Sequence, residues 1–354
     1  MLRFSSFLFP ESREPGRDTQ VIEETLEEAR LCEALGFDAL WLAEHHFDGN
    51  CAYVDPVTFA AAVVTATNRI KVGFAVAQVS LHHPTRLAEQ MSLLDNLSRG
   101  RIIVGLGRGT AYNVYEYQGY GIPAEEALER YEEAEGIMLK AWTSPDGLKH
   151  EGKFWNLNMP RLRPVPYTKP HPYVIRAASS EHGAMHLARR GVPFMMNVQP
   201  QHVTEQRLAV YAKTMGEAGY DEAHVAHCLR ESWVWRNIVV AETDAEAERI
   251  ALPAFEGMQQ HRKALREKVL VEQGVILKPD TAAPGRTSAE NALIYGSVET
   301  ITRHMAAIEA TGVGGVILHF RMGPMAAEVA QRSIRLFMSE VAPRFHIPAA
   351  VAAQ

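Results

Sequence analysis

Apolar and polar positions follow two different periods along this chain. Short runs dense in Val, Ile, Phe and Leu alternate with longer segments, such as residues 19–35, whose apolar residues recur at three- and four-residue spacing. The short runs predict parallel strands covered on both faces, and the longer segments predict amphipathic helices. Gly36 follows the first helix in a position that favours a C-terminal cap, and Asp55 with Pro56 opens the next. The pattern therefore predicts a regular alternation of strands and helices.

Eight apolar runs are the predicted strands. They comprise residues 2–8, 37–43, 69–76, 101–107, 173–177, 193–197, 231–240 and 315–320. Eight strands with intervening helices favour a closed (β/α)8 TIM barrel, and a single domain of residues 1–354 fits the usual size of that fold. A doubly wound open sheet has the same alternation, and the pattern alone does not exclude it.

Two stretches interrupt the alternation. Residues 144–171 are rich in Pro, Gly and aromatic residues and predict a hairpin or an irregular excursion before the fifth strand. Residues 264–295 predict a long insertion before the eighth strand. Long irregular loops are uncommon inside compact domains and often close over active sites, so we expect this insertion to be a lid.

Composition narrows the class of protein. The chain is 47% hydrophobic and 22% charged, which is typical of globular proteins, and its net charge of −6 disfavours a nucleic-acid partner. The three cysteines are widely spaced and form no disulfide or zinc pattern. Neither a signal peptide nor an uninterrupted apolar run of about 18 residues is present. We therefore expect a cytoplasmic protein without a membrane partner.

The first candidate for chemistry is the segment Glu44-His45-His46-Phe47, directly after the second predicted strand. In a barrel, residues just beyond the carboxyl ends of the strands line the active site. Because imidazole can donate or accept a proton near neutral pH, His45 is a candidate proton-transfer group. A structural role or simple surface exposure of the His-His pair remains open.

Two further motifs are suited to binding an anion. Arg108 lies in the glycine-rich run 105–109 after the fourth strand, and Ser179-Ser180 follows the fifth strand at the start of a helix. Glycines let the backbone approach a phosphate, arginine offers paired donors, and a helix N-terminus offers free N–H groups. The run is not a G-x-G-x-x-G motif, and an ordinary turn and a serine N-cap remain the alternatives.

Other histidines carry less information. His182 and His186 are four residues apart on one predicted helix, which could present two ligands to a metal. With no HExxH pattern and no third ligand, we interpret them as surface residues and expect no metal. The last strand ends in His319-Phe320-Arg321, whose polar groups are expected to face the barrel mouth.

Taken in order, these motifs resemble the bacterial luciferase-like flavin-dependent monooxygenase family, and the luciferase α subunit in particular. The resemblance extends from about residue 2 to residue 342. The matching segments are GFDALWLAEHHF (36–47), KVGFAVAQVSLHHP (71–84), LLDNLSRGRIIVGLGRG (93–109), VIRAASSEHGAMHLARRGVPFM (174–195), GSVETI (296–301) and TGVGGVILHF (311–320).

The resemblance implies a barrel enzyme that binds reduced FMN, delivered by a separate flavin reductase. Oxygen reacts with the reduced flavin to form a C4a-peroxyflavin, which oxidises an organic substrate that we expect to be mainly apolar. His45 would lie near the flavin and handle protons during this chemistry. Members of the family are often dimers, so a homo- or heterodimer is expected here.

The resemblance also implies a set of cofactor-binding residues. Arg108 and Ser180, with Ser179 beside it, match the positions that bind the flavin phosphate. A non-proline cis peptide under the flavin ring would map onto Ala75–Val76. Met195 and Asn197 match positions that line the ring, and Tyr112 and Asn113 correspond to an aromatic–amide pair after a one-residue insertion.

Two positions depart from the family pattern. Gly107 replaces the reactive cysteine that luciferase carries beside the flavin, which we expect to open space near the ring. Light emission is thereby less favoured than a general monooxygenase activity. Gly183 occupies the position three residues after Ser180 where the family often has Thr or Ser, so only a backbone donor is available there.

Two other functions remain open on the sequence alone. One is an oxidoreductase of the same barrel family that uses a deazaflavin cofactor in place of FMN. The other is a non-catalytic, flavin-binding partner subunit, against which His45 argues, because the luciferase β subunit lacks the His-His pair.

Overall fold

The computed structural model describes residues 1–109, 113–144, 146–272, 274 and 287–345. Its main sheet contains the strands β1 (Arg3–Leu8), β2 (Ala39–Leu42), β3 (Lys71–Phe74), β4 (Ala77–Gln78), β5 (Ile102–Gly107), β8 (Tyr173–Ala178), β9 (Phe194–Met196), β10 (Trp233–Val240), β11 (Leu293–Gly296) and β12 (Gly315–His319). The described helices are α1 (Asp18–Leu35), α2 (Pro56–Ala66), α3 (Pro84–Ser98), α4 (Val114–Gly119), α5 (Ala127–Thr143), α6 (Glu181–Arg189), α7 (Gln201–Glu217), α8 (Glu222–Glu231), α9 (Asp244–Glu272), α10 (Ala289–Ala292), α11 (Val298–Glu309) and α12 (Ala327–Leu336).

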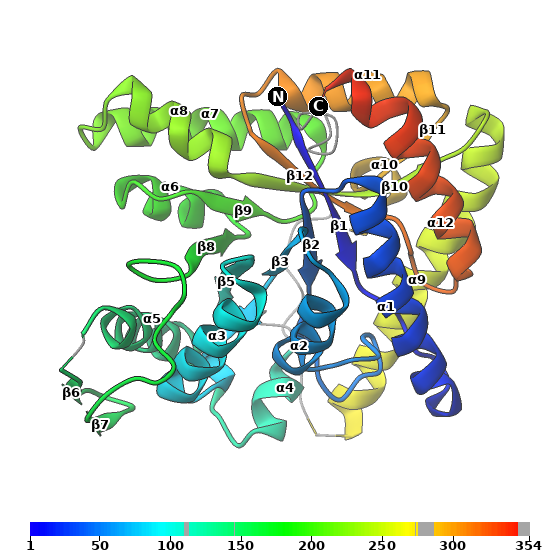
Figure 1. Ribbon diagram of the computed structural model, residues 1–354. Helices are drawn as coiled ribbons and strands as arrows, with labels where there is room; N and C mark the ends of the chain where they lie inside the picture. Colours follow the sequence, from blue (N-terminus) through cyan, green and yellow to red (C-terminus); the bar gives the residue numbers. More distant parts are fainter. Residues whose placement is uncertain (110–112, 145, 273, 275–286, 346–354) are drawn as a thin grey trace.

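Eight parallel strands close into a ring. Each strand pairs with the next in the order β1, β2, β3, β5, β8, β9, β10, β12, and β12 pairs with β1 again. These are the eight strands that the apolar runs predict. The closed (β/α)8 barrel is confirmed, with the helices around the strands, and the open-sheet alternative is excluded (Figure 1).

The first helices form for the reasons that their sequences suggest. α1 ends at Gly36, whose φ of 88° places it in the left-handed region that suits glycine. α2 begins after Asp55, whose carboxylate accepts hydrogen bonds from the N–H groups of Val57 and Thr58, and Pro56 occupies the first turn. Both predicted boundaries are confirmed.

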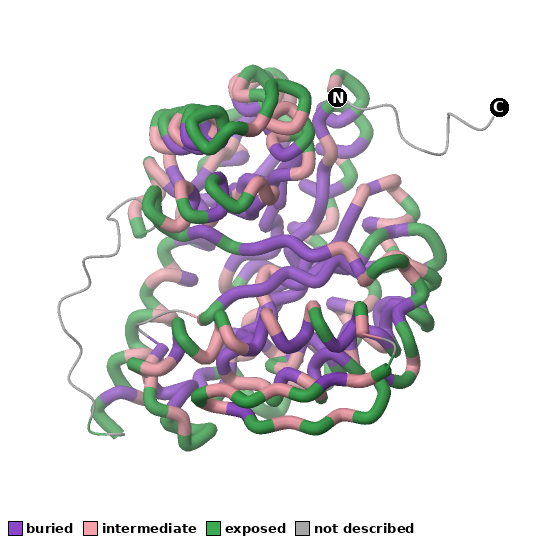
Figure 2. The backbone as a smooth tube through the Cα atoms, turned by 90° about the vertical axis from the view of Figure 1, so that its left-hand side faces the viewer, coloured by how far each residue is buried: buried purple, intermediate pink, exposed green. Residues whose placement is uncertain are grey.

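Two indole rings fill the amino-terminal half of the barrel. Trp41 and Trp233 meet edge to face with ring centroids 5.4 Å apart, and Trp41 Nε1 donates to Ser5 Oγ at 2.8 Å. A Cβ added at Gly73 would lie 2.6 Å from Trp41 Cζ3, and one at Gly315 would lie 2.3 Å from Trp233 Cε3. Glycine is therefore required at these two buried positions of the neighbouring strands. In Figure 2 the strands in the interior are coloured as buried.

The predicted interruptions have different outcomes. Residues 144–171 contain the antiparallel hairpin of β6 (Leu148–Glu151) and β7 (Asn156–Met159), as expected. In the second stretch, residues 264–295, α9 continues to Glu272 and β11 begins at Leu293, so the described part of the predicted insertion lies before the eighth barrel strand, β12. β11 pairs with the end of β10 that projects beyond the barrel. Residues 273 and 275–286 lie outside the described residues.

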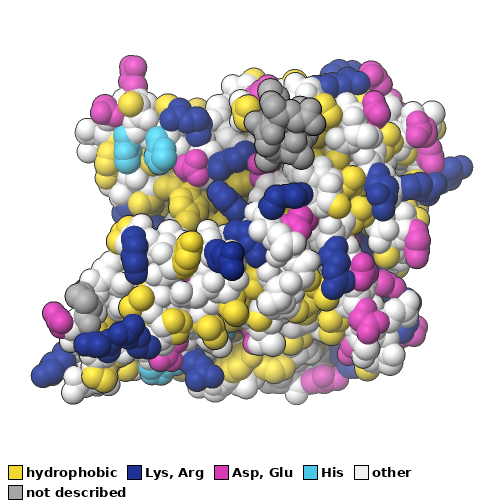
Figure 3. All heavy atoms as spheres, viewed as in Figure 1, with side chains coloured by type: hydrophobic (Ala, Val, Ile, Leu, Met, Phe, Trp, Pro, Cys, Tyr) yellow, Lys and Arg dark blue, Asp and Glu magenta, His cyan; other side chains and the backbone are white. Residues whose placement is uncertain are grey.

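The exterior is mixed in character. On the face seen in Figure 3, Lys and Arg side chains are interspersed with acidic and hydrophobic ones and form no continuous basic area. None of the helices in the described ranges has a span long and apolar enough to cross a bilayer.

Replacing Gly315 with Ala should lower the free energy of unfolding by about 1–3 kcal/mol, because the added methyl group must displace the buried Trp233 ring. Urea unfolding followed by tryptophan fluorescence measures the change. Gly136→Ala is the matched control: Gly136 lies inside α5, and apart from its own helix backbone no atom lies within 4 Å of an added Cβ. This control should gain about 0.5–1 kcal/mol from helix propensity. Equal effects of the two substitutions would contradict the packing argument.

Candidate active site

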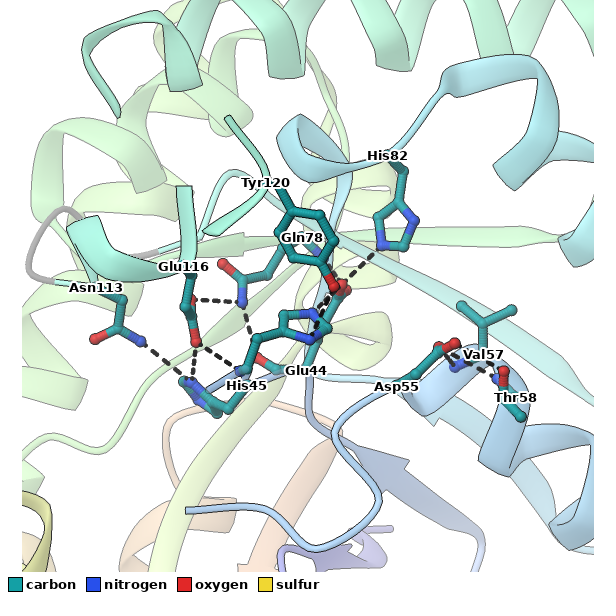
Figure 4. Close-up of polar contacts among 11 residues, drawn as sticks. Glu44, His45, Asp55, Val57, Thr58, Gln78, His82, Asn113, Glu116 and Tyr120 are labelled. Atoms are coloured by element: carbon teal, nitrogen blue, oxygen red, sulfur yellow. Dashed lines mark hydrogen bonds and ion pairs between the residues drawn. The ribbon is translucent and has the colours of Figure 1, made fainter. Parts of the chain in front are cut away.

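A network of polar side chains gathers beyond the carboxyl ends of β2 and β4 and under the short helix α4 (Figure 4). At its centre is Glu116, whose side chain is fully buried. Its Oε1 lies 3.1 Å from His45 Nδ1 and accepts the His46 backbone N–H at 3.1 Å. Its Oε2 accepts a hydrogen bond from Gln78 Nε2 at 2.9 Å. The first candidate residue, His45, is therefore held by a carboxylate that the sequence pattern did not single out.

Glu116 determines how His45 can act. A carboxylate facing Nδ1 favours a proton on that nitrogen and leaves Nε2 as the nitrogen available to other groups. Burial lowers the pKa of His45, but the hydrogen bond and the charge of Glu116 outweigh it and raise that pKa. The side chain is 30% exposed, so the ring can meet a bound molecule. Asn113 at the start of α4 lies beside the ring, with its side-chain amide 3.2 Å from His45 Nδ1.

A second buried carboxylate, Glu44, organises the other half of the network. Its Oε1 lies 2.9 Å from His46 Nε2 and 2.7 Å from His82 Nε2, and its Oε2 accepts the Gln78 backbone N–H at 2.6 Å. Burial raises the pKa of Glu44, yet the His82 charge and these hydrogen bonds lower it to about 2. The pKa of His82 is raised in turn, since the charge of Glu44 outweighs burial. Gln78 also donates from Nε2 to the Glu44 carbonyl at 2.9 Å, which joins the two halves.

The predicted phosphate-binding residues follow two adjacent strands. β5 pairs with β8, so Arg108 after β5 and Ser179 and Ser180 after β8 share one edge of the barrel. The exposed Arg108 guanidinium has no hydrogen bond or ion pair within the part of the chain that the structure describes. Ser180 Oγ accepts the Gly183 N–H at 3.1 Å, so the N-cap interpretation is confirmed. Capping uses the hydroxyl as an acceptor and leaves its O–H to donate.

The residues expected around the flavin ring come from β5, from β9 and from the connection between β3 and β4. The Ala75–Val76 peptide bond is cis, as the resemblance implies, and both residues are partly buried. The Met195 side chain on β9 reaches β5, because a Cβ at Gly105 would lie 2.9 Å from its Cε. The expectation that Gly107 opens space is wrong: a Cβ there would lie 2.4 Å from Val76 Cγ2, so the Val76 side chain already fills that volume.

The remaining sequence candidates are placed in different surroundings. Tyr112 lies outside the described residues, and Asn197 Oδ1 accepts from Gln199 Nε2 at 3.0 Å. His182 and His186 are exposed on α6, and the described residues contain no group of three or more His, Cys, Asp or Glu side chains arranged for a metal.

The end of β12 and the loop after β1 contribute to the same mouth. His319 is 1% exposed and lies on the barrel wall, whereas Arg321 pairs with Glu24 of α1. The Phe9 ring lies edge to face between two imidazoles, with its centroid 5.4 Å from that of His45 and 6.1 Å from that of His319. Period-two alternation along β1 could have indicated that Phe9 faces inward.

A separate cavity of about 170 Å³ lies at the opposite end of the barrel. Its lining comes from the amino ends of the strands, where Arg3 Nη1 and Glu231 Oε2 form an ion pair at 3.2 Å. Barrel enzymes place their chemistry at the carboxyl ends, so the polar network is the better candidate site.

Known proteins resemble the chain over most of its length. The sequence model of the luciferase-like monooxygenase family matches residues 2–315. Limonene 1,2-monooxygenase of Rhodococcus erythropolis is 25% identical over 344 residues, which cover 97% of this chain and 86% of that protein. The alkanal monooxygenase alpha chain of Photorhabdus laumondii is 26% identical over 229 residues, 64% of this chain and 63% of that one. The chain thus spans less than two thirds of the length of the alkanal monooxygenase chain.

Solved structures share the fold. A monooxygenase from Streptomyces bottropensis has a TM-score of 0.78 and 25% identity, covering 98% of this chain and 100% of its own. The oxygenating constituent of 3,6-diketocamphane monooxygenase from Pseudomonas putida, a structure in complex with FMN, has a TM-score of 0.76 at 21% identity and covers 98% and 100%. An F420-dependent secondary alcohol dehydrogenase has a TM-score of 0.75 and 17% identity, and the match covers 98% of this chain and 99% of that one.

The variant Glu44→Gln should lose about 3 kcal/mol of folding free energy near pH 6, given the fall in the Glu44 pKa from 4.5 to about 2. Because the folded pKa is the lower one, this stabilisation is complete above pH 4.5 and disappears as the pH falls toward 2. The part of this stabilisation that comes from the charge of His82, whose pKa is raised, is complete below pH 6.5 and disappears at higher pH. The difference between wild type and variant should therefore be largest between pH 4.5 and 6.5.

Urea unfolding at about pH 3, 5.5 and 8 measures this dependence. Glu27→Gln is the control, since the Glu27 side chain is 65% exposed in its pair with Arg30 and should change stability by less than about 0.5 kcal/mol. A loss of equal size at all three pH values would show that the Glu44 charge is not what stabilises the network.

Proposed function

Because the chain belongs to the luciferase-like monooxygenase family, we propose that it is a monooxygenase that takes reduced FMN from a separate flavin reductase and uses O2 to oxidise a mainly apolar organic substrate. The observation that carries this proposal is His45, held at the barrel mouth by the buried carboxylate of Glu116. The matches to limonene 1,2-monooxygenase and alkanal monooxygenase support it. A dimer of this chain, with itself or with a related chain, is part of the proposal.

The residues at the mouth fit FMN. The exposed guanidinium of Arg108 and the N-terminus of α6 offer a cation and free N–H groups for a phosphate dianion. The hydroxyls of Ser179 and Ser180 would add donors beside them. The isoalloxazine ring would lie against Ala75, Val76 and Met195, whose side chains are apolar.

Bound reduced FMN would supply the electrons that activate oxygen. The protein's part is to manage protons and water. Glu116 stabilises the protonated form of His45, so this side chain can hold a proton near neutral pH and release it from Nε2 toward the bound flavin and oxygen. We also propose that residues 264–295 cover the site and exclude water. α9, which carries the first part of this segment, supports the idea because its Arg262 lies over the Phe9 ring, 4.8 Å from its centroid.

One alternative has a specific observation in its favour. An F420-dependent secondary alcohol dehydrogenase shares the fold, which supports a deazaflavin oxidoreductase as the second candidate. A deazaflavin oxidoreductase would consume no oxygen, so an oxygen electrode separates the two functions. A non-catalytic flavin-binding subunit is disfavoured by the His45–Glu116 contact, which positions a proton-transfer group that such a subunit does not need.

The variant Arg108→Ala should weaken FMN binding by about tenfold or more, because it removes a charge-assisted contact to the phosphate. Riboflavin, which lacks the phosphate, should bind wild type and variant alike. Fluorescence titration of both flavins measures the two affinities. Arg335→Ala, which removes an exposed arginine of α12, is the control and should change neither. Equal losses for FMN and riboflavin would overturn the phosphate role of Arg108.

The variant His45→Ala should lose about a hundredfold or more of its turnover while its affinity for FMN stays within several-fold. The test is anaerobic titration with photoreduced FMN, then rapid mixing with oxygenated buffer while flavin absorbance is recorded. Wild type should show a transient spectrum distinct from reduced and oxidised FMN, and the variant should not. Loss of FMN binding in the variant would show that His45 is structural.

The variant Glu116→Gln tests the same site in a second way. It keeps the shape of the side chain and removes the charge that raises the pKa of His45. The pH at which His45 loses its proton should therefore fall in this variant. The measurement is the pH dependence of turnover. If it is the same in wild type and variant, Glu116 does not act through His45.

A further inference from the structure

Two buried polar atoms on the wall of the barrel mouth have no hydrogen-bond partner among the described residues. They are Trp235 Nε1 and His319 Nε2. The two side chains come from the paired strands β10 and β12, with ring centroids 6.4 Å apart. A buried polar atom without a partner is destabilising unless a ligand or an ordered water completes it. This pair therefore indicates a place where a polar group is bound.

The hydrogen bonds of Asn237 define what His319 offers. Asn237 Nδ2 donates to the Ala292 carbonyl at 2.8 Å, so its Oδ1 is the acceptor that faces His319 Nδ1 at 3.0 Å. Nδ1 must then carry the proton. Burial and the charge of Arg262 lower the pKa of His319 to about 3, against the effect of the backbone carbonyls of Phe9 and Arg321. The ring is consequently neutral at physiological pH, and Nε2, which has no hydrogen bond among the described residues, is left as an acceptor.

Trp235 supplies the complementary group. An indole N–H can only donate, so this pair of atoms presents one donor and one acceptor. Phe7 joins them, with its ring centroid 4.4 Å from that of Trp235 and 5.4 Å from that of His319. Phe9 stacks on Phe7 at 5.5 Å and extends the aromatic wall to His45. Apart from Asn237, the Phe9 and Arg321 carbonyls and the charge of Arg262 near His319, the neighbouring side chains are aromatic.

We propose that Trp235 and His319 form a subsite for the hydroxyl group of an otherwise apolar substrate, a proposal that deepens the function proposed above and rests on it. The hydroxyl would donate to His319 Nε2 and accept from Trp235 Nε1, which leaves both atoms satisfied. A ketone could accept from Trp235 alone, and a hydrocarbon could satisfy neither atom. Phe7 and Phe9 would direct the carbon skeleton from this anchor toward His45. The anchored hydroxyl selects and orients the substrate and need not be the group that is oxidised.

The test compares three molecules of similar shape in each of two sets. The cyclic set is cyclohexanol, cyclohexanone and methylcyclohexane, and the linear set is 2-octanol, 2-octanone and 2-methyloctane. Ligand-observed NMR measures dissociation constants for the full-length protein, both loaded with oxidised FMN and free of flavin. In at least one set the alcohol should bind about tenfold more tightly than the hydrocarbon, because the hydrocarbon leaves both buried groups unpaired.

Four variants assign the preference to the two side chains. Trp235→Phe removes the donor and keeps an aromatic ring, and His319→Leu removes the acceptor; each should reduce the preference for the alcohol several-fold. His319→Gln retains an acceptor and should preserve much of it. Trp233→Phe is the matched control, since it removes an equally unpaired indole N–H two residues earlier on β10, at the other end of the barrel.

The outcomes separate the proposals. Any of three results would overturn the subsite. These are equal binding of alcohol and hydrocarbon in both sets, a preference for the alcohol that survives both Trp235→Phe and His319→Leu, and no binding of either alcohol. Indole N–H signals that keep their positions in the variants would exclude misfolding as the cause of a loss. If the alcohol preference is present and FMN does not bind, the subsite stands and the monooxygenase proposal fails.

Discussion

The pairing of β1 with β12 closes the sheet, and every functional feature of the molecule depends on that closure. The strands run parallel, so closing the ring brings all of their carboxyl ends to one mouth. Residues as distant in the chain as Phe9, His45 and His319 meet there through their rings. At the other end the same closure brings the Trp41 and Trp233 rings together edge to face and fills the interior of the barrel. The mouth thus carries polar and aromatic side chains above a packed core.

Two buried carboxylates determine the electrostatics of that mouth. Glu44 and Glu116 would repel each other in an apolar interior, and each is stabilised by a histidine and by Gln78 between them. The amide of Gln78 donates to the Glu116 carboxylate and to the Glu44 carbonyl, so it joins the two groups without carrying charge. The consequence is a division of roles: Glu44 maintains the architecture with His46 and His82, and Glu116 adjusts the proton affinity of His45.

Histidines on opposite sides of the mouth differ because their neighbours differ. His45 faces a carboxylate, which raises its pKa, whereas His319 faces an amide oxygen and lies near the charge of Arg262, which lowers its pKa. One imidazole is therefore suited to exchange protons and the other to accept a hydrogen bond without changing its charge. The Phe9 ring between them separates these two environments.

The sequence by itself determined the eight strands, the first helix boundaries, the hairpin and the identity of the residues that follow each strand. Those features depend on local periodicity, on caps such as Asp55 and Gly36, and on the rule that polar residues after barrel strands share one end. The resemblance to a known family added the cis peptide at Ala75–Val76. Only the tertiary structure decided which side chains pair across the mouth. Glu116 is 71 residues from His45 in the chain, and no local pattern links them. The same reason explains the error at Gly107, because the volume beside it is filled by Val76 from the connection between β3 and β4.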